Sequence, residues 1–78
     1  MSERKPFNLP TCKPGQVIRA DHTRRGTITA RVLDVQPHRI QVLIVTGSWR
    51  YLSQDDDLPG DIVWLSDVNN LCTVTVVH

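Results

Sequence analysis

Apolar, β-branched residues alternate with turn signals along most of the chain, and this pattern predicts five strands. Val, Ile and Thr together make up 22 of the 78 residues, whereas Ala occurs twice, Lys twice and Glu once. Because strong helix formers other than Leu and Arg are scarce, the chain is predicted to be mostly β. The expected strands span residues 16–20, 27–36, 39–46, 61–66 and 71–77.

The second and third expected strands should form a tight antiparallel hairpin. Pro37 lies in the short connection between them, where its fixed φ favours a turn. Within the second strand, the apolar positions change phase after Val32 and continue at Leu33 and Val35. This change of phase predicts a β-bulge or a sharp bend.

The third and last strands differ in the faces that they are expected to bury. The third strand has apolar residues on both faces, Ile40, Val42 and Ile44 on one and Leu43 and Val45 on the other, so we expect it to be central and covered on both sides. The last strand alternates cleanly, which predicts one inward and one outward face. Its inward residues should be Cys72, Val74 and Val76, and its outward residues Thr73 and Thr75.

The strand rhythm of residues 14–77 resembles that of an SH3-like small β-barrel. The resemblance rests on five strands, short connections, a longer polar loop over 21–26, a bent second strand and the Pro-Gly-Asp entry at 59–61. The alternative is an OB-like barrel, which usually carries a helix before its fourth strand; residues 49–57 would form a poor helix. We therefore expect one small β-barrel domain over 14–78, preceded by a flexible N-terminal arm over 1–13 that lacks periodicity.

Length and composition limit the possible classes of protein. A chain of 78 residues forms one domain with a thin core, which makes an enclosed substrate cavity improbable. No apolar run is long enough to span a bilayer, and the first residues lack the apolar centre of a signal peptide. Only two cysteines are present, Cys12 and Cys72, which indicates free thiols. These features predict a cytoplasmic protein without a membrane partner.

Charge is distributed unevenly along the chain, and arginine dominates the basic residues. Residues 1–39 carry eight Lys or Arg and three acids, whereas residues 40–78 carry one Arg and five Asp. The planar guanidinium of arginine pairs bidentately with carboxylate or phosphate and stacks on flat groups, so the arginines are candidate partner contacts. This candidate cluster consists of Arg19, Arg24, Arg25, Arg31 and Arg39.

The segment Trp49-Arg50-Tyr51 is the second candidate contact. If it is extended, Trp49 and Tyr51 point the same way and form a platform for a base or a protein anchor, with Arg50 opposite. In the other interpretation, one of the two rings covers the end of the barrel. Trp64 lies among apolar residues and is expected in the core or half-buried.

The sequence gives no pattern that is typical of catalysis, a cofactor or a metal. The histidines and cysteines lack the spacing of a zinc site, no serine lies in a nucleophile elbow, and no glycine-rich loop precedes a helix. The acidic run 55–57 lacks the spaced ligands of a calcium loop and is expected to be solvated. We therefore expect no enzyme, no cofactor and no metal site.

The leading hypothesis is a non-catalytic binding module that docks on another protein. By analogy it would be an accessory or inhibitory factor of the kind that phages and plasmids carry. The arginine cluster, the aromatic pair or the free edge of strand 71–77 would make the contact, and the same edge could form a homodimer. The alternative is a nucleic-acid-binding barrel that uses the arginines and the two rings, although a pI of about 7.9 weakens it.

Overall fold

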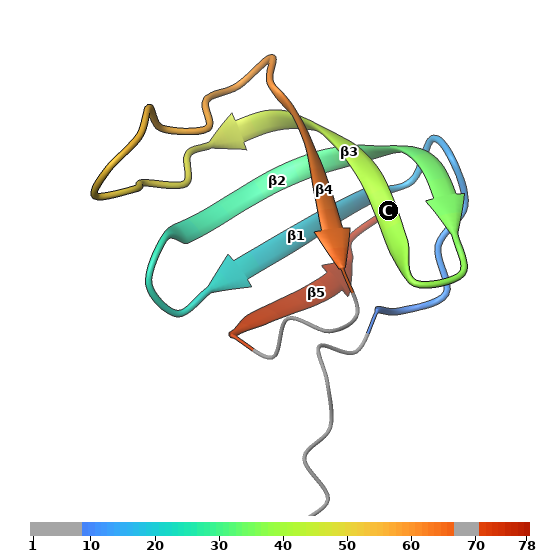
Figure 1. Ribbon diagram of the computed structural model, residues 1–78. Helices are drawn as coiled ribbons and strands as arrows, with labels where there is room; N and C mark the ends of the chain where they lie inside the picture. Colours follow the sequence, from blue (N-terminus) through green and yellow to red (C-terminus); the bar gives the residue numbers. More distant parts are fainter. Residues whose placement is uncertain (1–8, 67–70) are drawn as a thin grey trace, which may run out of the picture.

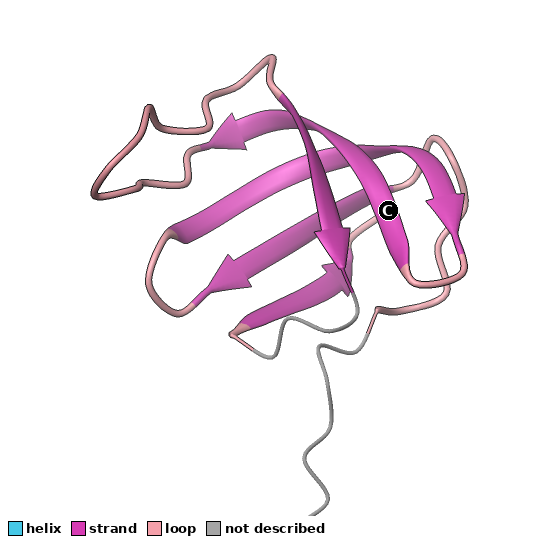
Figure 2. Ribbon diagram, viewed as in Figure 1, coloured by secondary structure: helices cyan, strands magenta, loops and turns pink. Residues whose placement is uncertain are grey.

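A computed structural model describes residues 9–66 and 71–78, and these residues form five strands and no helix (Figures 1 and 2). No helix that could cross a membrane is found among them. The predicted all-β class is therefore confirmed. The strands are β1 (Val17–His22), β2 (Gly26–Gln36), β3 (Arg39–Gly47), β4 (Ile62–Ser66) and β5 (Cys72–Val76).

All strand pairs are antiparallel, and the sheet has the order β4-β3-β2-β1-β5. The first four strands follow one another as a meander, and β5 returns to pair with β1. The sheet curls into a half-barrel whose two outer strands are β4 and β5 (Figure 1). The last strand is thus an edge strand, as the sequence allowed.

The β2–β3 hairpin is tight and contains the predicted bulge. Gln36 pairs with Arg39 across a two-residue turn, and the register shifts between Val32 and Asp34. Leu33 is the extra residue at this shift, so the change of phase in the sequence is confirmed as a bulge. A second shift, between Thr29 and Ala30, was not predicted.

Strand β3 is paired on both sides, but only one of its faces is covered. Its inner residues Ile40, Val42 and Ile44 are buried, whereas Leu43 is half-buried and Val45 is 48% exposed. The expectation of a strand covered on both faces is wrong, because nothing among the described residues packs on the outer face of the sheet. The middle strand of the sheet is β2.

The core lies on the concave side of the curled sheet. The predicted alternation of β5 is confirmed, since Cys72 and Val74 are buried while Thr73 and Thr75 are exposed. The buried apolar residues are Cys12, Ile18, Ala20, Ile28, Ala30, Val32, Ile40, Val42, Ile44, Trp49, Leu65, Cys72 and Val74.

The N-terminal arm contributes to this core before the predicted domain start at residue 14. Cys12 is buried and Leu9 packs against the core cluster. The Cys12 thiol donates a hydrogen bond to the carbonyl oxygen of Pro10 at 3.3 Å. Residues 9–13 are therefore docked on the domain. Residues 1–8, the rest of the predicted flexible arm, lie outside the described residues.

Candidate functional site

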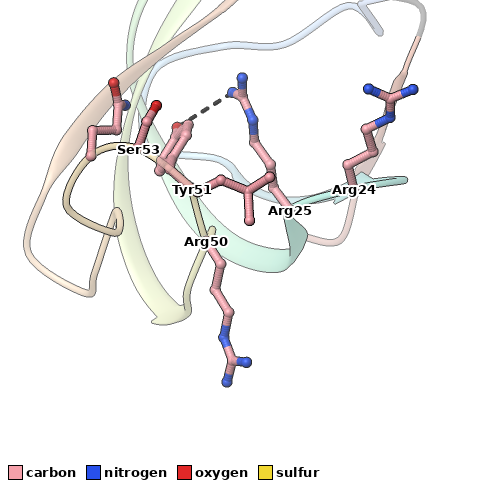
Figure 3. Close-up of a pocket in the computed structure, with 7 residues that line it drawn as sticks. Arg24, Arg25, Arg50, Tyr51 and Ser53 are labelled. Carbon is pink, nitrogen blue, oxygen red and sulfur yellow. Dashed lines mark hydrogen bonds between the residues drawn. The ribbon is translucent and has the colours of Figure 1, made fainter.

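A pocket with a volume of about 590 Å³ lies at one end of the half-barrel, between the β1–β2 turn and the loop that follows β3 (Figure 3). Arginine side chains come to it from both of these segments. The lining residues are Arg24, Arg25, Arg50, Tyr51, Leu52, Ser53 and Gln54.

The two walls of the pocket meet through backbone contacts. The amide of Arg50 donates a hydrogen bond to the carbonyl oxygen of Arg25 at 3.1 Å. Gly47 has a φ of +81°, and a Cβ at this position would clash with the backbone of Thr27. Only glycine combines this left-handed conformation with so close an approach. The sequence thus brings the turn and the loop together by glycine and backbone hydrogen bonding.

The outer wall is a loop that is closed on itself. The amides of Trp49 and Asp57 each donate to the carbonyl oxygen of the other, at 3.0 and 2.9 Å. The amide of Tyr51 donates to Oδ1 of Asp56 at 3.3 Å, and the Tyr51 hydroxyl donates to Oδ2 of Asp57. These bonds fix the base of the loop, from which Leu52 extends fully exposed.

Arg25 and Tyr51, which both line the pocket, are in contact with each other. The Arg25 guanidinium carbon lies 4.4 Å from the centre of the Tyr51 ring, and its Nη1 donates to the Tyr51 hydroxyl at 3.4 Å. Burial, together with the hydrogen bond to the Asp57 carboxylate and its charge, raises the pKa of Tyr51 to about 12, against the opposing charge of Arg25. Tyr51 is therefore protonated at neutral pH and can donate to Asp57.

The arginines of the pocket point in different directions. Figure 3 shows Arg50 extending away from the side on which the Arg24 and Arg25 guanidiniums lie. Within residues 9–66 and 71–78, neither Arg24 nor Arg50 forms an ion pair with a carboxylate. Unpaired guanidiniums that diverge in this way suit several negative groups along one chain better than a single small anion.

His22 supports the turn that carries Arg24 and Arg25. It is only 7% exposed, and its Nδ1 accepts a hydrogen bond from the Arg24 amide at 3.1 Å. Its ring also makes an edge contact with Trp49, with ring centres 5.6 Å apart. Burial, followed by the charges of Arg25 and Arg24, lowers the pKa of His22. The neutral imidazole is thus the form that holds the turn.

The aromatic residues do not form the platform that the sequence suggested, and the two tryptophans differ from their expected exposure. Trp49 is 3% exposed and covers the end of the core, so it cannot stack on a ligand, and its role as a contact is corrected. Tyr51 is half-buried beneath Arg25, so no open pair of rings is formed. Trp64 was expected in the core or half-buried but is 41% exposed, since it lies on the outward face of β4.

The other predicted arginines do not reach the pocket. Arg19, Arg31 and Arg39 have exposed side chains on strands β1, β2 and β3. Arg19 forms an ion pair with Asp21, with 3.3 Å between Nε and Oδ2. The structure therefore divides the predicted arginine cluster into a pocket group and a sheet group, and it adds Arg50 to the pocket group.

Sequence reasoning missed Leu52, Ser53 and Gln54 as pocket residues. The only indication in the sequence is that these residues interrupt the strand pattern after Tyr51. Loops that interrupt a strand pattern often carry contact residues. Nothing in the sequence indicates that this loop folds back beside the β1–β2 turn.

A second, acidic hollow adjoins the arginine pocket and shares Gln54 with it. Its volume is also about 590 Å³. Among the described residues, no group of three or more His, Cys, Asp or Glu is arranged to hold a metal ion. The remaining lining residues are Asp55, Asp56, Leu58 and Asp61.

Comparison with known proteins gives no relative, since no family model, no curated protein and no solved structure matches the chain. The arrangement of the residues themselves therefore has to support any assignment of function.

Proposed function

We propose that this protein is a non-catalytic binding module that docks on another protein through the arginine pocket. The observation that carries this proposal is that Arg24 and Arg50, both without a carboxylate partner among the described residues, line one hollow beside the exposed Leu52. Charged groups at the pocket and one apolar side chain at its rim resemble the mixture found at protein interfaces.

The ligand is an extended acidic segment of the partner. The guanidiniums of Arg24, Arg25 and Arg50 diverge, so successive carboxylates along one chain can each meet one of them. An apolar side chain of the same segment would pack on Leu52, which is otherwise fully in solvent.

A protein ligand fits this end of the molecule better than nucleic acid. The acidic hollow adjoins the arginine pocket through Gln54, and its carboxylates repel a phosphate backbone that extends past the pocket. Base stacking also lacks a platform, since Trp49 is buried and Arg25 covers Tyr51. A protein segment can carry acidic residues into one hollow and a lysine or arginine into the other.

The strand order supports the SH3-like assignment as part of this proposal. A meander of four strands whose fifth strand returns to the first is an economical way to curl a small sheet around one core. No helix precedes β4 in the described residues, which disfavours the OB-like alternative. The free thiols of Cys12 and Cys72 fit the cytoplasmic location that the sequence predicts.

Fluorescence anisotropy with two labelled probes of equal charge tests this function. The probes are an oligoglutamate peptide that ends in two lysines, which the acidic hollow can accept, and a single-stranded oligothymidylate. We expect the peptide to bind more tightly, and the variant R24A/R50A to weaken its binding about tenfold. Arg31→Ala, on the outer face of the sheet, is the matched control and should bind the peptide like the wild type.

Two results contradict the proposal. Equal peptide binding by wild type and R24A/R50A removes the pocket as the site. Tighter binding of the oligothymidylate, with a steep salt dependence that R24A/R50A reduces, establishes the nucleic-acid alternative instead.

A further inference from the structure

Strand β4 has an edge that no other described strand covers. It is the last strand of the sheet and pairs only with β3. The amide of Ile44 donates to the carbonyl oxygen of Asp61 at 3.0 Å, at the entry to this pair. Because hydrogen bonding alternates along an antiparallel ladder, the backbone groups of Ile62 and Trp64 then face away from β3. They are positioned to pair with another strand.

The same two residues present apolar side chains on the outer face. Ile62 is 57% exposed and Trp64 is 41% exposed. Ile62 lies opposite Leu43 on β3, and Leu43 lies opposite Arg31 on β2. Ile62, Leu43 and Arg31 therefore lie side by side in a row that crosses the sheet from β4 to β2.

A second arginine covers Trp64. The guanidinium carbon of Arg39 lies 3.9 Å from the centre of the Trp64 ring, and its Nε donates to Oε1 of Gln36 at 2.9 Å. Neither Arg39 nor Arg31 forms an ion pair with a described carboxylate. Stacking on the ring leaves the Nη atoms of Arg39 without a carboxylate partner among the described residues, so they can pair with one from a ligand.

We propose that β4 accepts an extended segment of a partner protein as an additional strand. The outward side chains of this segment are one apolar residue beside Ile62 and one acidic residue, two positions away, beside Trp64 and Arg39. Main-chain hydrogen bonds to Ile62 and Trp64 supply part of the affinity, and the acidic residue supplies selectivity. This surface is separate from the arginine pocket and does not depend on its function.

Charge complementarity favours this occupant over a second copy of the chain. In a β4–β4 dimer, the residues that would face the outer surface of the partner strand are Ile62, Trp64 and Ser66. None of these three residues is a carboxylate, so the described strand of a second copy would offer Arg39 no negative group. An acidic segment from another protein can both hydrogen-bond to the backbone of β4 and place a carboxylate beside Arg39.

A substitution that acts only on the backbone tests strand addition. Ile62→Pro removes the amide that faces away from β3 and keeps the β3–β4 hydrogen bonds, as expected for proline on an edge strand. Ile62→Thr is its matched control, since it shortens the side chain but keeps the amide. Arg39→Gln tests the acidic preference without touching the β4 backbone. Thermal unfolding of each variant verifies that it is folded.

The probes are short random peptides displayed on phage and selected against R24A/R50A, in which the arginine pocket is disabled. We expect enrichment of sequences with Asp or Glu two positions from Val, Ile or Leu. The enriched peptides should bind Ile62→Pro at least about tenfold more weakly than Ile62→Thr. Selection against R24A/R50A/R39Q should lose the acidic preference and keep the apolar one.

Three results overturn this inference. They are a selection without enrichment, enriched peptides that bind Ile62→Pro and Ile62→Thr equally, and sedimentation that shows a dimer which Ile62→Pro dissociates. The last result would assign the edge to a second copy. Failure of the oligoglutamate probe at the arginine pocket would leave this inference intact, because the selection uses a protein without that pocket.

Discussion

The backbone amide of Arg24 donates a hydrogen bond to Nδ1 of His22, 3.1 Å away, so a neutral imidazole holds the turn that carries two pocket arginines. Protonation of Nδ1 would remove the acceptor and place a third positive charge beside Arg24 and Arg25. The stability of the domain and the order of its arginine pocket are therefore linked through one histidine.

Acidification should destabilise the protein through His22. Because burial lowers its pKa below the ordinary value of 6.5, the unfolded chain takes up a proton first. The stabilising contribution is complete above about pH 6.5 and is lost as the pH falls from there towards the lower pKa of the folded state. Urea unfolding across this range measures the loss. His22→Asn keeps an acceptor that does not titrate, and its profile should be flatter; an identical profile would contradict this assignment.

Gly47→Ala should destabilise the domain far more than Gly15→Ala. Both glycines have positive φ, +81° and +93°, but only a Cβ at Gly47 meets neighbouring backbone, whereas nothing lies within 4 Å of one at Gly15. We expect Gly15→Ala to lower the free energy of unfolding by about 1 kcal/mol, because of the backbone conformation alone. Gly47→Ala should lower it by about 3 kcal/mol or more. Denaturant unfolding compares them, and equal losses would show that the two segments do not approach as closely as described.

The two tryptophans should respond differently to truncation. Trp49→Ala removes a buried ring from a thin core and should cost about 3–5 kcal/mol, enough to unfold a domain of this size. Trp49→Phe should cost less, because it keeps a ring and removes a buried Nε1 that has no hydrogen-bond partner. Trp64→Ala should cost about 0.5 kcal/mol. Chemical denaturation of these variants gives the order of their stabilities, and fluorescence should lose its short-wavelength component when Trp49 is replaced and keep it in Trp64→Ala.

Tyr51 should ionise at unusually high pH. It is the only tyrosine in the sequence, so tyrosinate absorbance reports this residue alone. Its pKa rises to about 12 in the folded state, against an ordinary value of 10.0. Since the folded state retains the proton more strongly, this contribution to stability is complete below about pH 10 and disappears as the pH rises towards 12. Asp57→Asn should shift the titration to lower pH; a titration near 10 in the wild type would contradict the Tyr51–Asp57 contact.

The presence of the five strands could be predicted from the sequence because each strand depends on a local pattern of residues. The alternation around Val74 and the phase change at Leu33 each identify a structural feature that a few neighbouring residues determine. The burial of Trp49 and the exposure of Trp64 could not be predicted in this way. Both depend on which loop covers the end of the core, and on the outer face of β4 being free of any described neighbour.

The candidate site could be predicted only in part for the same reason. Arg24, Arg25, Arg50 and Tyr51 stand out by residue type, and the structure brings these four together. Arg31 and Arg39 have the same chemistry, but strand register places them on the sheet surface. Residue type indicates what a side chain can bind, whereas pairing across distant segments decides which side chains share a site.

The atoms that hold the walls of the arginine pocket together are not the atoms that line it. Backbone hydrogen bonds such as that from Arg50 to Arg25, together with the glycine approach at Gly47, hold the walls. The side chains of Arg24, Leu52 and Ser53 line the hollow without taking part in these contacts. Such a division permits rapid divergence of specificity, because lining residues can change while the fold persists. The same loop is accordingly a natural place to randomise when this domain is engineered to recognise a new ligand.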